Sequence, residues 1–110
     1  MFRSRQQHPP LLLETTIETR TCAYAFTKGV LILKLNVQGR RGWPDRLFIN
    51  KGRIALVEFK RPGVRPTVHQ KWIHERLSQH GFKVSIVDSL AGGKRLVDIL
   101  LEAPRTGRLP

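Results

Sequence analysis

The sequence predicts a single α/β domain whose elements follow the order α-β-β-β-α-β-α. Three segments carry apolar residues near the 3.6-residue period of a helix. Between them lie short runs rich in β-branched and leucine residues, bounded by Gly and Pro. The length of 110 residues supports one domain with one modest core. Because the central strands are apolar on both sides, we expect helices to cover both faces of the sheet.

The first helix and strand precede a basic loop. Apolar residues predict a helix over 12–28, and Gly29 fits the position that follows a helix C-cap. Residues 30–37 predict a strand. The loop Gly39-Arg40-Arg41-Gly42 then leads to the centre of the chain.

The next two strands form a predicted hairpin. Residues 46–49 and 53–60 flank Lys51-Gly52, a two-residue turn. This turn sets a register in which Asp45 lies opposite Glu58. On the same face it pairs Leu47 with Leu56 and Ile49 with Ile54. A three-residue loop would move the register by one and break this pairing.

The second half of the domain continues with a helix over 67–80. Thr67 is suited to its N-cap and Gly81 to its C-terminal end. A strand over 83–87 and a helix over 90–101 follow. We assign 12–102 to the domain, 1–11 to a flexible basic arm and 103–110 to a flexible tail.

Composition favours a polyanionic partner. Twenty Lys and Arg face eight Asp and Glu, which gives a formal charge of +12, so nucleic acid or an acidic membrane surface is expected. No apolar run approaches the ~20 residues of a membrane span, and no signal-peptide pattern is present. Cys22 is the only cysteine and fits a small buried side chain, so we expect a cytoplasmic protein without an internal disulfide. No P-loop or GxGxxG motif indicates a nucleotide cofactor, and the histidines show no metal-ligand spacing.

Two acidic motifs stand out from this basic background, Gly42-Trp43-Pro44-Asp45 and Glu58-Phe59-Lys60. Cross-strand partners have Cβ atoms roughly 4.5–5.5 Å apart, so the two carboxylates can hold one cation. Oxygen ligands suit Mg²⁺ or Mn²⁺, which can activate water and polarise a phosphodiester. Lys60 would offset charge in the transition state. The alternative is an edge salt bridge among the three side chains.

The same residues resemble the VRR-NUC family of the PD-(D/E)xK nuclease superfamily. The resemblance covers residues 14–101 and rests on a series of short motifs. They are Gly42-Trp43-Pro44-Asp45-Arg46, Glu58-Phe59-Lys60-Arg61, Gln70 and Gly81-Phe82-Lys83-Val84. It implies a restriction-endonuclease-like αβββαβ core with a mixed central sheet flanked by helices. It also implies metal-dependent hydrolysis of DNA and a homodimer similar to Holliday junction resolvases.

The resemblance also implies roles for single residues. Asp45 and Glu58 would bind the metal together with the backbone carbonyl of Phe59. Lys60 would be the catalytic lysine, and Gln70 would face the site from the second helix.

An acidic residue on the first helix completes the family pattern. Glu18 fits better by its distance from Gly29 and would be a catalytic residue and metal ligand. Glu14, one turn earlier on the same face, is the alternative. Either carboxylate could instead only favour a helix N-terminus.

Several cationic residues near the two acids are candidate DNA ligands, because guanidinium offers a fork of donors to phosphate. They are Arg40, Arg41, Arg46, Arg61 and Arg65. Each could also be only a solvated charge. Trp43 could stack on an unpaired base or wedge a junction, or it could pack under the loop.

Together these observations predict a metal-dependent endonuclease for branched DNA, with a four-way junction favoured. Symmetric cutting of a junction needs two sites, which predicts a C₂ homodimer. Two alternatives stay open: a nuclease for flaps, nicked or single-stranded DNA, and a non-catalytic DNA-binding module.

Overall fold

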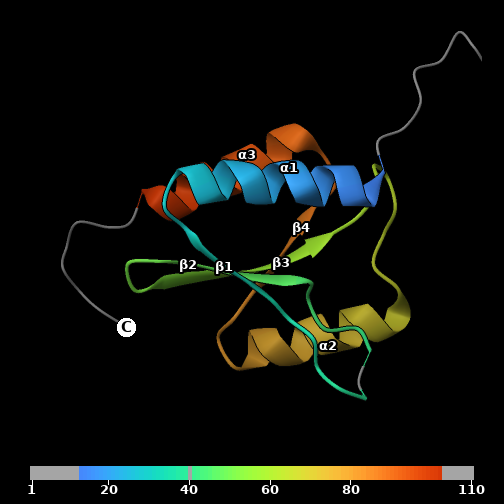
Figure 1. Ribbon diagram of the computed structural model, residues 1–110. Coiled ribbons are helices and arrows are strands. Elements are labelled where there is room, and N and C mark those ends of the chain that lie inside the picture. The colour runs from blue at the N-terminus through green and yellow to red at the C-terminus, as the bar shows by residue number, and fades with distance from the viewer. Residues whose placement is uncertain (1–12, 40, 103–110) are drawn as a thin grey trace, which may run out of the picture.

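The computed structural model describes residues 13–39 and 41–102. The predicted arm 1–11 and tail 103–110 lie outside these residues. Within the described residues, three helices and a four-stranded sheet form three layers (Figure 1). Helices α1 (Glu14–Thr27) and α3 (Leu90–Leu101) lie side by side on one face of the sheet, and α2 (Val68–Gln79) lies on the other.

The sheet is mixed, as predicted. Its order is β1 (Leu31–Lys34), β2 (Arg46–Asn50), β3 (Arg53–Phe59) and β4 (Val84–Val87). The first three strands are antiparallel, and β4 runs parallel to β3. A parallel neighbour requires a crossover connection, which α2 supplies.

The β2–β3 hairpin has the predicted register, with Leu47 opposite Leu56 and Ile49 opposite Ile54. Its turn places Lys51 at φ 47° and Gly52 at φ 84°, as a tight two-residue hairpin requires.

The expected opposition of Asp45 and Glu58 is displaced by one position. The ladder ends with Arg46 opposite Val57, yet the Asp45 amide also donates to the Val57 carbonyl at 2.9 Å. Two successive residues therefore face Val57, as in a β-bulge, and a bulge redirects the side chain that it carries. Here that side chain is Asp45.

The core lies between the sheet and the α1–α3 layer. It is a cluster of buried apolar residues: Ile17, Ala25, Val30, Phe48, Val57, Phe59, Val87, Val97 and Leu100. The two helices approach closely because Gly93 lacks a side chain. A Cβ at Gly93 would collide with the Thr21 hydroxyl.

The opposite face of the sheet is covered only in part, whereas the sequence predicted cover on both sides. The single helix α2 has 12 residues and contacts β4. Four apolar side chains on this face remain accessible to solvent: Leu31 at 56%, Leu33 at 43%, Ile54 at 42% and Ile86 at 41% exposure.

Strand β1 also ends at Lys34 rather than at the expected residue 37. Beyond it, the Leu35 amide still donates to the Asp45 carbonyl at 2.9 Å. No helix of the described ranges is both long and apolar enough to cross a membrane.

Candidate functional site

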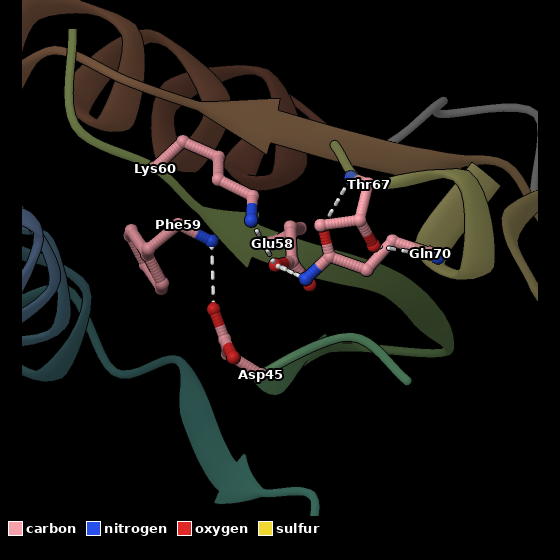
Figure 2. A network of polar contacts seen from close by, with 6 residues as sticks. All are labelled: Asp45, Glu58, Phe59, Lys60, Thr67 and Gln70. Atoms are coloured by element: carbon pink, nitrogen blue, oxygen red, sulfur yellow. Dashed lines mark hydrogen bonds and ion pairs between the residues drawn. The ribbon is translucent and has the colours of Figure 1, made fainter. Parts of the chain in front are cut away.

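The two predicted carboxylates lie near each other where β2 begins and β3 ends, with Asp45 turned to the Phe59 amide and Glu58 turned to Gln70 and Lys60 (Figure 2). Fully buried Pro44 anchors the chain in front of Asp45. The Asp45 carboxylate turns toward β3, and its Oδ2 accepts a hydrogen bond from the Phe59 amide at 2.8 Å. The bulge thus brings the Asp45 carboxylate into contact with the β3 backbone, next to Glu58.

Glu58 is the most enclosed acid of the site, with a side chain only 3% exposed. Its Oε2 accepts a hydrogen bond from Gln70 Nε2 at 2.9 Å and lies 3.5 Å from Lys60 Nζ. Its Oε1 is buried and has no partner among the described residues. One oxygen is therefore held in place while the other keeps its lone pairs free.

Gln70 is oriented by the start of α2. Thr67 is the N-cap, and its hydroxyl accepts from the Gln70 amide N–H at 3.1 Å. In return, Gln70 Oε1 accepts from the Thr67 N–H at 2.9 Å, which completes a capping box. Because the carboxamide oxygen is committed to the cap, the Nε2 group points at Glu58 (Figure 2).

Both carboxyl groups hold protons more readily than usual. Burial raises the pKa of Glu58 to about 7, and the charge of Asp45 adds to this while Lys60 opposes it. The pKa of Asp45 is also raised, first by burial, against the lowering effect of the Phe59 amide. Two neighbouring anions in a dry site create this proton affinity, and a bound cation would relieve it.

The first-helix acids differ in their partners. Glu18 Oε2 accepts from Arg46 Nε at 2.7 Å, so its carboxylate is paired. Glu14 forms no ion pair within the described ranges. Its pKa is raised by burial and by the charge of Asp45, while Lys60 lowers it. The charges of the site therefore act on Glu14, and its carboxylate has no ion-pair partner in the described part of the chain.

The candidate DNA ligands fall into three groups. Arg41, Arg61 and Arg65 are exposed, Arg46 is paired with Glu18, and Arg40 lies outside the described residues.

Trp43 is partly buried and lines a cavity of about 350 Å³ against α2. Its Nε1 is sealed from solvent without a partner in the described part of the chain. This geometry corresponds to packing under the loop rather than to a ring that projects outward.

His74 is a neighbour of the site that the sequence did not single out. Burial and the charge of Lys60 lower its pKa, and its Nε2 is buried without a partner among the residues that the structure describes. It follows Gln70 by four residues, so the helical period could have indicated that both face inward.

The donor set fits a small divalent cation of the Mg²⁺ or Mn²⁺ type. Asp45, Glu58 and the predicted Phe59 carbonyl offer hard oxygens, and Glu58 Oε1 is a buried acceptor that lacks a donor over the described part of the chain. Over residues 13–39 and 41–102, no three His, Cys, Asp or Glu side chains are grouped to hold a metal. Water molecules would therefore have to complete the coordination shell.

Comparison with known proteins gives two similarities, while no family model matches the chain. The chain is 39% identical over 80 residues to "Putative nuclease p44" of Acyrthosiphon pisum secondary endosymbiont phage 1, covering 72% of this chain and 86% of the phage protein. A solved structure described as "VRR_NUC domain" superposes with a TM-score of 0.67 at 33% identity, covering 81% of this chain and 94% of that chain. Each match spans more than four fifths of the other protein, so the similarity extends over a whole domain.

Proposed function

The chain belongs to the VRR-NUC family of nucleases and has its restriction-endonuclease-like fold, and from this premise we propose that it is a divalent-metal-dependent endonuclease acting on DNA. One observation supports metal dependence above all. The neighbouring carboxyl groups of partly buried Asp45 and buried Glu58 have raised pKa values, and Glu58 Oε1 is buried without a donor among the described residues. Two carboxylates placed together away from water are destabilised in their charged forms, and a bound cation would offset that free-energy cost.

The metal would be held by Asp45, Glu58 and the Phe59 carbonyl. When bound, Mg²⁺ or Mn²⁺ supplies a water of lowered pKa and polarises the phosphodiester. Lys60 places its ammonium 3.5 Å from Glu58, where it offsets negative charge that develops on the phosphoryl oxygens. Gln70 holds Glu58 in one rotamer through its Nε2 hydrogen bond.

We prefer Glu14 as the first-helix acid because its carboxylate forms no ion pair within the described ranges, although Glu18 also acts on the site, since its charge raises the pKa of Asp45. Glu18 would have to leave Arg46, a contact of 2.7 Å, before it could turn to a metal. Glu14 needs no such exchange and already responds to the charges of Asp45 and Lys60. We therefore assign Glu14 to the outer coordination sphere and Glu18 to the positioning of Arg46.

DNA is the proposed substrate because the formal charge is +12 and exposed arginines lie close to the acids in the chain. Arg41, Arg61 and Arg65 are exposed and would contact phosphates of the DNA backbone. A phosphate backbone contacted in this way gives binding that weakens with salt.

A homodimer on branched DNA is the more specific form of the proposal. Symmetric cutting of a four-way junction requires two sites. The apolar sheet face left open by α2, with Leu31, Leu33, Ile54 and Ile86, is a surface that a second copy could cover. Sedimentation equilibrium would test this proposal. A monomer at micromolar protein concentration would contradict the homodimer.

A cleavage panel tests the nuclease proposal. Four-way junction, flap, nicked duplex, linear duplex and single strand would each be incubated with Mg²⁺, Mn²⁺ or EDTA. We expect metal-dependent cutting with the junction preferred. Preferential cutting of flaps or single strands would change the substrate class, and no cutting with either metal would favour a DNA-binding module.

Matched variants test the site itself. Asp45→Asn and Lys60→Ala should abolish cleavage and retain DNA binding. Glu102→Gln, which changes an exposed acid at the far end of α3, should cut normally. Cleavage that persists in both site variants would show that the assignment is wrong.

A further inference from the structure

Helix α2, which also carries Gln70, presents an exposed aromatic residue. Trp72 is 52% exposed, although large aromatic side chains favour burial. Its ring lies nearly parallel to that of His69, with centroids 6.1 Å apart and planes inclined by 21°. The Arg76 guanidinium lies 5.1 Å from the Trp72 centroid. The indole is therefore held as part of an ordered stack on the surface.

An open cavity of about 670 Å³ adjoins this stack. Its lining comes from the loop before β2 and from the start of α2: Gly39, Arg41, Gly42, Thr67, His69, Gln70, Trp72 and Ile73. Gln70 belongs to the cavity wall and also donates to Glu58 at 2.9 Å. The cavity is thus linked to the proposed catalytic site through Gln70, while Asp45, Glu58 and Lys60 do not line it.

The loop can border the cavity only because Gly42 lacks a side chain. Gly42 has φ 86°, and a Cβ there would lie 2.8 Å from His69 Cδ2 and 3.2 Å from the His69 carbonyl. The loop that carries Asp45 and the helix that carries the aromatic pair are consequently in direct contact. Their separation is fixed by the backbone.

The chemistry of the cavity fits a nucleobase on a phosphate backbone. Its walls combine aromatic rings with the Arg41 cation, and none of the described residues that line it is acidic. Exposed Lys71 and Arg76 add two positive charges to α2, against the one negative charge of exposed Glu75. Aromatic faces bordered by cations bind single-stranded nucleotides by stacking and charge. A base inside a duplex must first be unpaired and unstacked, which costs a few kcal/mol, so an unpaired base enters more readily.

We propose that this cavity binds one unpaired nucleobase of the DNA substrate by stacking on the Trp72–His69 pair, next to the phosphate that is cut. The inference rests on the proposed nuclease function and gives it a substrate class, DNA with an unpaired nucleotide at the cleavage position. Branched, flapped and nicked DNA can offer such a nucleotide at a lower cost than an intact duplex, in which a base pair must first be opened.

The test measures binding in EDTA, so that no cutting is needed. The probes are a perfect duplex and the same duplex with one unpaired 2-aminopurine. Unmodified protein should bind the second probe more tightly and quench its fluorescence. Because one stacked base contributes about 1–3 kcal/mol, Trp72→Ala should weaken binding to this probe about 5- to 150-fold. It should change duplex binding less than about twofold and abolish the quenching.

Two further variants complete the design. Trp72→Phe keeps an aromatic face and should retain most of the preference and the quenching. Phe26→Ala removes another exposed aromatic, 76% accessible at the end of α1, and should behave as unmodified protein. The stacking site would be overturned if unmodified protein bound both probes with equal affinity. It would also be overturned if Trp72→Ala lost as much affinity for the perfect duplex as for the probe with the unpaired base. Absence of cleavage in the separate panel would instead overturn the nuclease proposal and leave this binding result standing.

Discussion

The buried carboxyl group of Glu58 should make the metal-free protein less stable as the pH rises, and Glu58→Gln should remove that loss. Burial and Asp45 raise its pKa from the ordinary 4.5 to about 7. The folded protein then binds this proton more tightly than the unfolded chain does. The stabilising contribution is complete below pH 4.5 and is lost as the pH rises through 7. At about 1.4 kcal/mol per pH unit, the unfolding free energy should fall by about 2–3 kcal/mol relative to the variant between pH 5 and pH 8.

Urea unfolding in EDTA, followed by tryptophan fluorescence, measures this difference at each pH. Glu102→Gln serves as the control, since it removes an exposed acid. Adding Mg²⁺ at pH 8 should stabilise the unmodified protein and leave Glu58→Gln unchanged, because a ligand stabilises only the state that binds it. If the stabilities of the unmodified protein and Glu58→Gln ran parallel from pH 5 to pH 8, the electrostatic account of the site would be refuted.

Three further outcomes are expected. Thr67→Val should lower the unfolding free energy by about 1 kcal/mol through loss of the N-cap. It should also slow cleavage, because Gln70 would be held less firmly. An unchanged cleavage rate would show that the N-cap does not influence the site. Gly93→Ala should cost about 1–3 kcal/mol by overpacking, with partial recovery on adding Thr21→Ala, as measured by chemical unfolding; a neutral effect would contradict the close approach of α1 and α3. Arg61→Ala should reduce the salt slope of DNA binding by about one, and an equal slope in anisotropy titrations would remove this side chain from the interface.

The hairpin and the central site residues could be predicted because local rules determine them. A two-residue turn leaves one register for β2 and β3, and that register places the start of one strand near the end of the other. The structure brings Asp45, Glu58, Lys60 and Gln70 together within one network. The bulge that turns Asp45 toward Phe59 was not predictable, since it depends on how the loop packs.

The remaining site features depend on contacts between distant segments. Glu14 and Glu18 share one helix face, and only the position of Arg46, on another element, decides which carboxylate is occupied. The two tryptophans show the same limit. Loop packing buries Trp43 in part, whereas Trp72 emerges on the outer face of α2, and sequence periodicity did not reveal that exposure.

The capping box at the start of α2 has a consequence for the choice of residue at position 70. A helix start of this type accepts glutamate as readily as glutamine. At this position, however, the side-chain nitrogen lies 2.9 Å from a carboxylate oxygen of Glu58. Glutamate at position 70 could still form the capping box. Its negative charge, however, would repel the carboxylates of Glu58 and Asp45. An uncharged amide meets both demands, and position 70 is thereby restricted by a neighbour twelve residues away in the chain.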